Sequence, residues 1–152
     1  MSDPTYKLTQ SVRTVTESKR LLLKLDRLLA SSHTTTSDYK NLSKKLTAVQ
    51  RQLLIEDLQD LDTTLSEPEA QKIISDIRNS IKKMPIATLE LAFQSSDLFT
   101  EEITDTMKAI IKTPCLVQIK HNPTIGGGIV IYFQGRHHDY SLTDKFDEFS
   151  KV

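Results

Sequence analysis

The spacing of apolar residues changes once along the chain, at Pro85, and this change constrains the fold more than any other feature. Before it, apolar residues recur at steps of three, four and seven, which places them on one face of a helix. After it, every second residue from Leu89 to Phe93 is apolar, as in a strand with one buried face. The pattern predicts an α+β chain of two domains, a helical one over residues 1–84 and a small α/β one over residues 85–152.

The first domain carries three helical patterns. One helix is expected over residues 6–30, a second begins after Ser37 as N-cap, and a third runs from the capping-box sequence at Ser66 to Lys83. Short links between helices favour an antiparallel unit of three long helices. The residues expected to face inward are Leu8, Val12, Val15, Leu22, Leu25 and Leu29 in the first helix, Leu42, Leu46, Val49 and Leu53 in the second, and Ile73, Ile74, Ile77 and Ile81 in the third.

The sequence pattern of the second domain predicts the order strand-helix-strand-strand-helix. A strand-helix-strand unit makes a right-handed crossover, so the first two strands should be parallel, and the third should return antiparallel beside the second. The strands are expected at 89–93, 115–120 and 129–133, the first helix from N-cap Thr100 to a point before Thr113, and a short last helix after Ser141.

Composition narrows the class of protein. A mean hydropathy of −0.34 and a charged share of 26% fit a soluble, largely helical chain, and no apolar run approaches the roughly 20 residues of a membrane-spanning helix. The first residues lack a basic and then apolar segment, so we expect no export signal. A single cysteine, Cys115, excludes an internal disulfide, and its apolar neighbours favour a buried structural thiol over a nucleophile.

The net charge is zero, yet the charges are segregated. Residues 7–51 carry ten Lys or Arg and three acids, whereas residues 52–69 carry six acids and no base. A basic stretch can bind nucleic acid or anionic lipid. Aromatic residues for base stacking are nearly absent there, which favours solvated helix faces that pair with neighbouring helices, and we expect no nucleic-acid partner.

Two clusters in the second domain invite a chemical interpretation. Gly126–Gly128 lack the lysine of a phosphate-binding loop and lead into a strand instead of a helix, so a structural role is favoured over nucleotide binding. His137, His138 and Asp139 follow a turn at Gln134; adjacent histidines on a strand point to opposite sides, which disfavours a shared metal ion. We therefore expect no cofactor, no metal and no catalytic residue. An enzyme that uses both clusters remains the alternative.

The glycine run and the residues after it resemble a family signature. They are similar to the C-terminal stretch of the delta subunits of F-type ATP synthases, whose mitochondrial relative is the oligomycin-sensitivity-conferring protein. That family carries acid-proline-Ser-Leu-Ile-Gly-Gly-Leu-Val-Ile and, further on, Asp-Gly-Ser. The positions that match it without a gap are Pro123, Gly127, Gly128, Asp139 and Ser141. The departures are Asn122 for the acid, Gly126 for an apolar residue and Tyr140 for the glycine of Asp-Gly-Ser.

The resemblance implies a non-catalytic stator, or peripheral-stalk, subunit of a rotary proton-translocating ATP synthase. It implies that residues 1–84 contact the alpha/beta catalytic head and residues 85–152 the b-type stalk subunits. The location implied is the cytoplasmic side of the inner membrane, reached only through partner subunits. A glycine pair before a strand is also similar to the E-type stalk subunit of V- and A-type ATPases. That alternative stays open, as does an unrelated helical adaptor.

Overall fold

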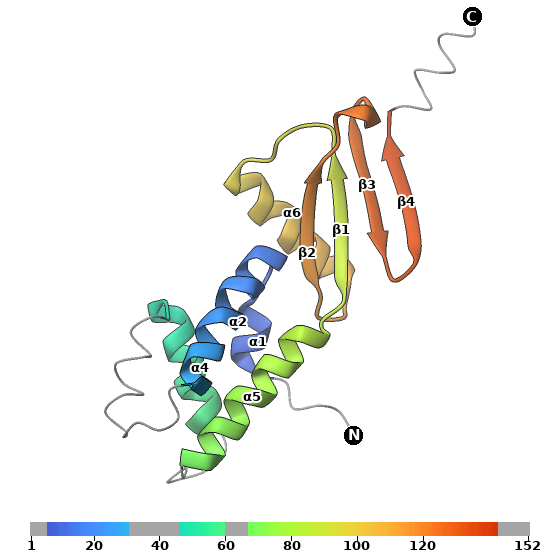
Figure 1. The fold of residues 1–152 in the computed structure, drawn as a ribbon. Helices are drawn as coiled ribbons and strands as arrows, with labels where there is room; N and C mark the ends of the chain where they lie inside the picture. Colours follow the sequence, from blue (N-terminus) through green and yellow to red (C-terminus); the bar gives the residue numbers. More distant parts are fainter. Residues whose placement is uncertain (1–5, 31–45, 60–66, 143–152) are drawn as a thin grey trace, which may run out of the picture. The chain divides into compact units, whose positions relative to one another are not determined.

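The structure is a computed structural model that describes residues 6–30, 46–59 and 67–142. The chain divides into two compact units, unit 1 (Met1–Met84) and unit 2 (Pro85–Val152), at the position where the apolar period changes. Helices make up the described part of unit 1, and a four-stranded sheet with one long helix makes up that of unit 2 (Figure 1). The predicted α+β class is confirmed.

The first predicted helix is two helices, α1 (Lys7–Ser11) and α2 (Val15–Ala30), so a single helix over residues 6–30 was wrong. A capping box starts α2 at Thr14: the Thr14 hydroxyl accepts from the Glu17 N–H at 3.1 Å, and the Glu17 carboxylate accepts from the Arg13 N–H at 2.9 Å. These bonds supply the first donors of α2 with partners. The capping sequence Thr-x-x-Glu lies within an apolar period that continues on both sides of it, and the prediction followed the period.

The break changes which residues of α2 are buried. Leu21, Leu25 and Leu28 are buried, whereas Val15, Leu22 and Leu29 from the predicted stripe are only partly covered. A new start of the helix resets its rotation, so the buried face shifts toward Leu21 and Leu28 beside the predicted stripe, while Leu25 of that stripe stays in the core.

The second predicted helix is described in part, as α4 (Ala48–Gln59), and the expected cap and first turns at Ser37 and Leu42 lie outside the described residues. Leu46 is buried as predicted, but Val49 is 67% exposed. The third predicted helix, α5 (Glu67–Lys83), is confirmed, and its four isoleucines are all buried: Ile73, Ile74, Ile77 and Ile81.

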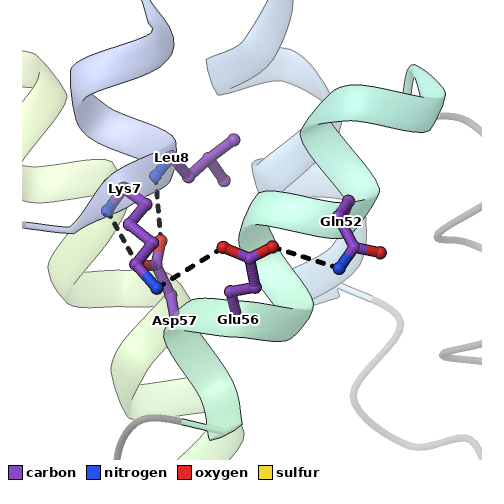
Figure 2. Close-up of polar contacts among 5 residues, drawn as sticks. All are labelled: Lys7, Leu8, Gln52, Glu56 and Asp57. Atoms are coloured by element: carbon purple, nitrogen blue, oxygen red, sulfur yellow. Dashed lines mark hydrogen bonds and ion pairs between the residues drawn. The ribbon is translucent and has the colours of Figure 1, made fainter.

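One buried carboxylate joins α1 to α4 (Figure 2). Asp57, on α4, is 5% exposed and accepts from the N–H groups of Lys7 and Leu8 at 2.8 and 2.9 Å. These are donors of the first turn of α1, which have no partner within their own helix. A residue about 50 positions away in sequence thus performs the role of an N-cap. Beside it, Lys7 forms an exposed ion pair with Glu56 at 3.4 Å.

Unit 2 contains a mixed sheet in the order β2-β1-β3-β4 (Figure 1). β1 pairs with β2 in parallel, as predicted, and with β3 antiparallel, and β3 pairs antiparallel with β4. The expectation that the third strand lies beside the second was wrong, because β3 lies on the other side of β1. The elements are β1 (Ile86–Leu91), α6 (Asp97–Ile110), β2 (Leu116–His121), the 3-10 turn η1 (Pro123–Ile125), β3 (Gly128–Phe133) and β4 (Arg136–Ser141).

The helix α6 packs on one face of this sheet, where Met107 joins a buried cluster with Ala87, Leu89, Cys115 and Val117. This face is the core of unit 2, and alternation along each strand supplies its residues.

The N-cap of α6 is Ser96, not Thr100 as predicted. The Ser96 hydroxyl accepts from the Phe99 N–H at 3.2 Å, while Thr100 lies within the helix and donates to the Ser96 carbonyl at 2.9 Å. Phe93, placed on the first strand by its period, lies beyond the end of β1 and is 46% exposed. Ser141 ends β4, and the short helix expected after it lies outside the described residues.

Candidate functional site

The loop between β2 and β3 crosses the carboxyl end of β1, and Asn122 fixes where it crosses. The Asn122 N–H donates to the carbonyl of Leu91, the last residue of β1, at 2.7 Å. Its side-chain amide donates to the Glu90 carboxylate at 2.9 Å, and its side-chain oxygen accepts from the Thr124 N–H at 3.1 Å. One side chain therefore joins the end of the central strand to the turn that follows, which carries the chain to the far side of β1.

Three consecutive glycines then lead the chain into β3 with positive φ angles. The φ values of Gly126, Gly127 and Gly128 are 64°, 144° and 84°. A Cβ on Gly128 would lie 2.2 Å from the carbonyl oxygen of Tyr140, and one on Gly127 would lie 3.0 Å from a methyl of Leu142. Gly128 has no room for any side chain because the obstacle is backbone, whereas Gly127 meets the end of a side chain that can move. The run is a tight backbone crossing.

The structure brings four of the five motif residues together at one end of the β3–β4 ladder. Gly128 pairs with Ser141, and the Gly127 carbonyl accepts from the Leu142 N–H at 3.0 Å. The Asp139 carboxylate accepts from the Ser141 N–H at 2.7 Å. Hydrogen bonds from Ser141 hold the pKa of the exposed Asp139 below its ordinary value, and the nearby His137 lowers it further.

Pro123, the fifth motif residue, begins the 3-10 turn at the start of the same loop. Its ring fixes φ near the value that a first helical position needs, and a missing N–H costs nothing there. Every motif residue thus helps to shape the backbone, either at the crossing or at the end of β4, and Asp139 does so through its carboxylate. These roles make the loop a structural site. Any binding function would then belong to the surfaces that the loop holds in place.

The histidine pair lies on β4, which is an edge strand with exposed side chains over residues 136–140. Gln134 and Gly135, with φ values of 48° and 75°, form the tight turn before it, as a two-residue hairpin requires. His137 and His138 point to opposite faces, as the period of a strand predicts: the first packs against Tyr132 and the second against Tyr140. Over the described residues, no group of three or more His, Cys, Asp or Glu could hold a metal ion.

Cys115 is fully buried in the core of unit 2, as its apolar neighbours predict. Burial raises the pKa of its thiol, and the opposing influence of Lys108 is smaller. A thiol that stays protonated and covered is a poor nucleophile, so this residue serves packing.

Within unit 1, Lys7 of the basic stretch pairs with Glu56 of the acidic segment. Arg78 of α5 pairs with Asp26 of α2. On the same two helices an open groove has Leu22 and Leu23 as its apolar floor, with Lys19, Asp26 and Lys82 around them. Leu23 is 60% exposed, so the groove presents an apolar strip between charged side chains.

Sequence reasoning missed the two polar residues that organise these units, Asp57 and Asn122. Asp57 appeared as one of six acids in a charged segment, and nothing local distinguishes a carboxylate whose partners lie about 50 residues away. Asn122 could have been found, because an Asn before Pro is typical of a turn in which the side chain binds the backbone two residues on. Where the described residues form helices, none is long and apolar enough to cross a membrane.

No protein-family model matches the chain, and no curated protein matches it. Among solved structures, it is similar to a chain in the cryo-EM structure of the Polytomella F-ATP synthase in primary rotary state 3. The two sequences are 27% identical, and the match covers 45% of this chain and 89% of that one with a TM-score of 0.37. A TM-score below 0.5 does not establish a common fold, so this likeness establishes neither the fold nor the function of the chain.

Proposed function

We propose that this chain is a stator subunit of a rotary proton-translocating ATP synthase, which links the catalytic head to the membrane-anchored stalk and resists the torque of the rotor. The observation that carries the proposal is the motif shared with the delta-subunit family, Pro123, Gly127, Gly128, Asp139 and Ser141. In unit 2 these residues shape one crossing and one strand end, so the match is a set of coupled backbone requirements. If the matches were chance agreements of residue type, the matched residues would not need to lie close together in the fold.

The division of the chain suits a clamp. A stator binds the head at one place and the stalk at another, and two compact units of different fold provide two different surfaces. We assign the alpha/beta head to unit 1, where the groove with Leu22 and Leu23 suits the apolar face of a partner helix. We assign the b-type stalk subunits to unit 2. The membrane is then reached only through those partners, on its cytoplasmic side.

A clamp requires stiffness and complementary surfaces, not acid-base chemistry. The central strand of unit 2 is paired on both sides, and the loop that crosses its end is fixed by hydrogen bonds of Asn122 with Leu91, Glu90 and Thr124. Such a unit transmits force without changing shape, because its contacts are backbone ladders with one register. Affinity would come from a few buried apolar contacts with charged residues around them.

The test is to deplete the chain from energised membranes and to add the purified protein back. Depletion should uncouple or release the catalytic head, which retains ATP hydrolysis, and re-addition should restore ATP synthesis in proportion to rebinding. Gly128→Val, which cannot form the crossing, should fail to restore synthesis, and Gly135→Ala, in an open turn, should restore it. Depleted membranes that synthesise ATP at the normal rate would refute the proposal, as would ATP turnover by the purified chain alone.

A further inference from the structure

β4 is an edge strand whose free side has a defined pattern of main-chain groups. Gly128 and Ser141 are partners in the ladder, and the Leu142 N–H donates to the Gly127 carbonyl. This bond joins the next pair along the ladder, Gly127 with Leu142, so Gly128 and Ser141 form a non-hydrogen-bonded pair. Hydrogen-bonded and non-hydrogen-bonded pairs alternate along an antiparallel ladder. The N–H and C=O groups of His137, Asp139 and Ser141 therefore point away from β3, toward the open edge of the sheet.

This edge lacks three of the features that usually prevent pairing. Natural edge strands often carry proline, lysine or a bulge, besides other charged side chains. β4 has no proline and no lysine, and its six residues pair with β3 in an unbroken register. One outward N–H, that of Ser141, is occupied by the Asp139 carboxylate. The blocked donor limits a new partner strand to the segment before Ser141, with His137 and Asp139 as the main-chain contacts.

The side chains of β4 show which strand would fit. From Arg136 to Tyr140 the order is cation, histidine, histidine, carboxylate, aromatic ring, so the charges and rings are arranged about His138. An antiparallel strand of the same sequence centred there places His137 opposite Asp139 of the other strand, twice. It also places Arg136 opposite Tyr140, twice.

We propose that β4 pairs antiparallel with β4 of a second copy of this chain, centred on His138, and joins the two sheets into one. The main-chain groups agree with this register. His137 and Asp139 are the residues whose N–H and C=O groups face outward, so His137 against Asp139 is a hydrogen-bonded pair in both halves of the interface. His138 against its own copy falls between them as a non-hydrogen-bonded pair. A shift by one residue would set outward-facing groups against inward-facing ones.

The two faces of the combined sheet also agree with this register. On one face, the imidazole of His137 meets the carboxylate of Asp139, which also accepts from the Ser141 N–H. On the opposite face, the guanidinium of Arg136 lies across from the ring of Tyr140, which is 65% exposed, so the pair can form a cation–π contact. An isologous pair of this kind closes on itself, as the symmetry of a dimer requires.

The other edge strand does not offer the same match. β2 begins with the buried Leu116 and Val117 and ends with the exposed Lys120 and His121. Antiparallel self-pairing of β2 would set these basic residues against apolar ones. The inference is therefore specific to β4. It is also independent of the stator role, because it uses only the free chain.

The experiment is sedimentation equilibrium of the purified full chain over roughly 1 to 500 µM, a range that suits a weak interface of few pairs. A reversible monomer–dimer equilibrium is expected. His137→Glu places two carboxylates together on each side of the axis, and Asp139→Lys places a lysine against a histidine. Each variant should weaken the dimer about tenfold or more. His121→Glu, the same change as the first on the other edge strand, should leave the dimer unchanged.

The decisive measurement mixes the two variants. In a heterodimer of His137→Glu with Asp139→Lys, one new pair is glutamate with lysine and the other is the native histidine with aspartate, so an equimolar mixture should dimerise at least as tightly as the native chain. A chain that stays monomeric throughout the concentration range would overturn the proposal. A dimer that both single variants leave intact would also overturn it, as would a mixture without recovery. Thermal unfolding of His137→Glu, which leaves the Ser141 contact in place, checks that the loss is one of pairing.

Discussion

The two units of the chain are stabilised by different parts of the polypeptide. In unit 1 side chains make the decisive contacts: the Asp57 carboxylate caps α1 from another helix, and Thr14 with Glu17 caps α2. In unit 2 the backbone makes most of them, through strand ladders and through a crossing at Gly127 and Gly128 that leaves almost no space for a side chain, and the Asn122 side chain fixes the crossing loop. Unit 1 depends mainly on contacts that particular side chains make, and unit 2 mainly on close backbone approaches at positions without a side chain.

This difference explains why a recognisable motif lies in unit 2. A cap can be supplied by Ser, Thr, Asp or Asn, and an apolar stripe by several residue types, so many sequences meet the demands of unit 1. A positive φ beside a backbone oxygen 2.2 Å from the missing Cβ admits glycine alone, as at Gly128. Requirements on the backbone therefore leave a more specific trace in sequence than requirements on side chains.

The largest effect should come from Gly128→Ala. The new methyl group would overlap the Tyr140 carbonyl oxygen, and the backbone at φ 84° would be strained as well. We expect the free energy of unfolding of unit 2 to fall by about 3 kcal/mol or more. Amide hydrogen exchange, measured peptide by peptide, should show the loss in residues 86–142 and little change in α2 and α5. An equal loss in both units would contradict the separation described above.

Gly135→Ala is the matched control, because it tests backbone strain without overlap. Gly135 also has a positive φ, 75°, but nothing lies within 4 Å of its added Cβ. The loss should be about 1 kcal/mol, the usual cost of a left-handed conformation for alanine. Equal losses for the two substitutions would show that the close approach at Gly128 has no energetic weight.

The next largest effect should come from Asp57→Ala in unit 1. It leaves the N–H groups of Lys7 and Leu8 buried or partly buried without their acceptor, which should cost about 2 kcal/mol. Glu56→Ala, one residue away, removes an exposed ion pair with Lys7 and an exposed hydrogen bond from Gln52, and should cost less than about 0.5 kcal/mol. Exchange of the α1 amides is the measurement. If both variants exchange alike, the Asp57 contact is not a cap.

Local patterns predicted most element types but not their partners. The strand period near Leu89, the turn at Gln134 and the third helix to Lys83 are each determined by neighbours in sequence, and each is found, whereas β4 after that turn was not among the predicted strands. The position of β3 beside β1 was not predicted, because the loop from Asn122 to Gly127 is long enough either for a hairpin with β2 or for a crossing over the end of β1. The crossing depends on the hydrogen bond from the Asn122 N–H to the carbonyl of Leu91, which is 31 residues earlier in the chain.

Element boundaries failed where two local signals competed. The apolar period continues through Thr14, and the capping box there overrides it, since a cap satisfies donors that a stripe cannot. At α6 two possible caps, Ser96 and Thr100, lie one turn apart, and the earlier one is used. The motif residues were identified as structural, and their meeting at Ser141 required the register of β4, which the sequence pattern does not contain.

Thr14→Ala should have a smaller effect than Asp57→Ala. It removes one side-chain acceptor of the capping box, which typically costs about 1 kcal/mol. Because the Glu17 carboxylate still accepts from Arg13, the start of α2 should remain at the same place and fray by about a turn. Thr14→Ser, which keeps the hydroxyl, is the control and should retain native exchange rates in the first turn. An α2 that extends back through Thr14 into α1 in the alanine variant would show that the break has another cause.

The smallest effect is a loss of stability at high pH, which we expect in unit 1 because of Tyr6. Burial raises the pKa of the Tyr6 phenol, and the charges of Asp76 and Asp57 raise it further. A pKa raised in the folded state means that the neutral phenol is favoured by folding; this stability is fully present below about pH 10, the ordinary pKa of tyrosine, and is lost as pH rises through the folded value. Hydrogen exchange of α1, corrected for its intrinsic pH dependence, should therefore report a loss of unit 1 stability above pH 10. In Tyr6→Phe this additional loss should vanish, while the alkaline response of unit 2 serves as the internal reference in both proteins. An alkaline loss in α1 that persists in Tyr6→Phe would assign the effect to groups other than the buried phenol.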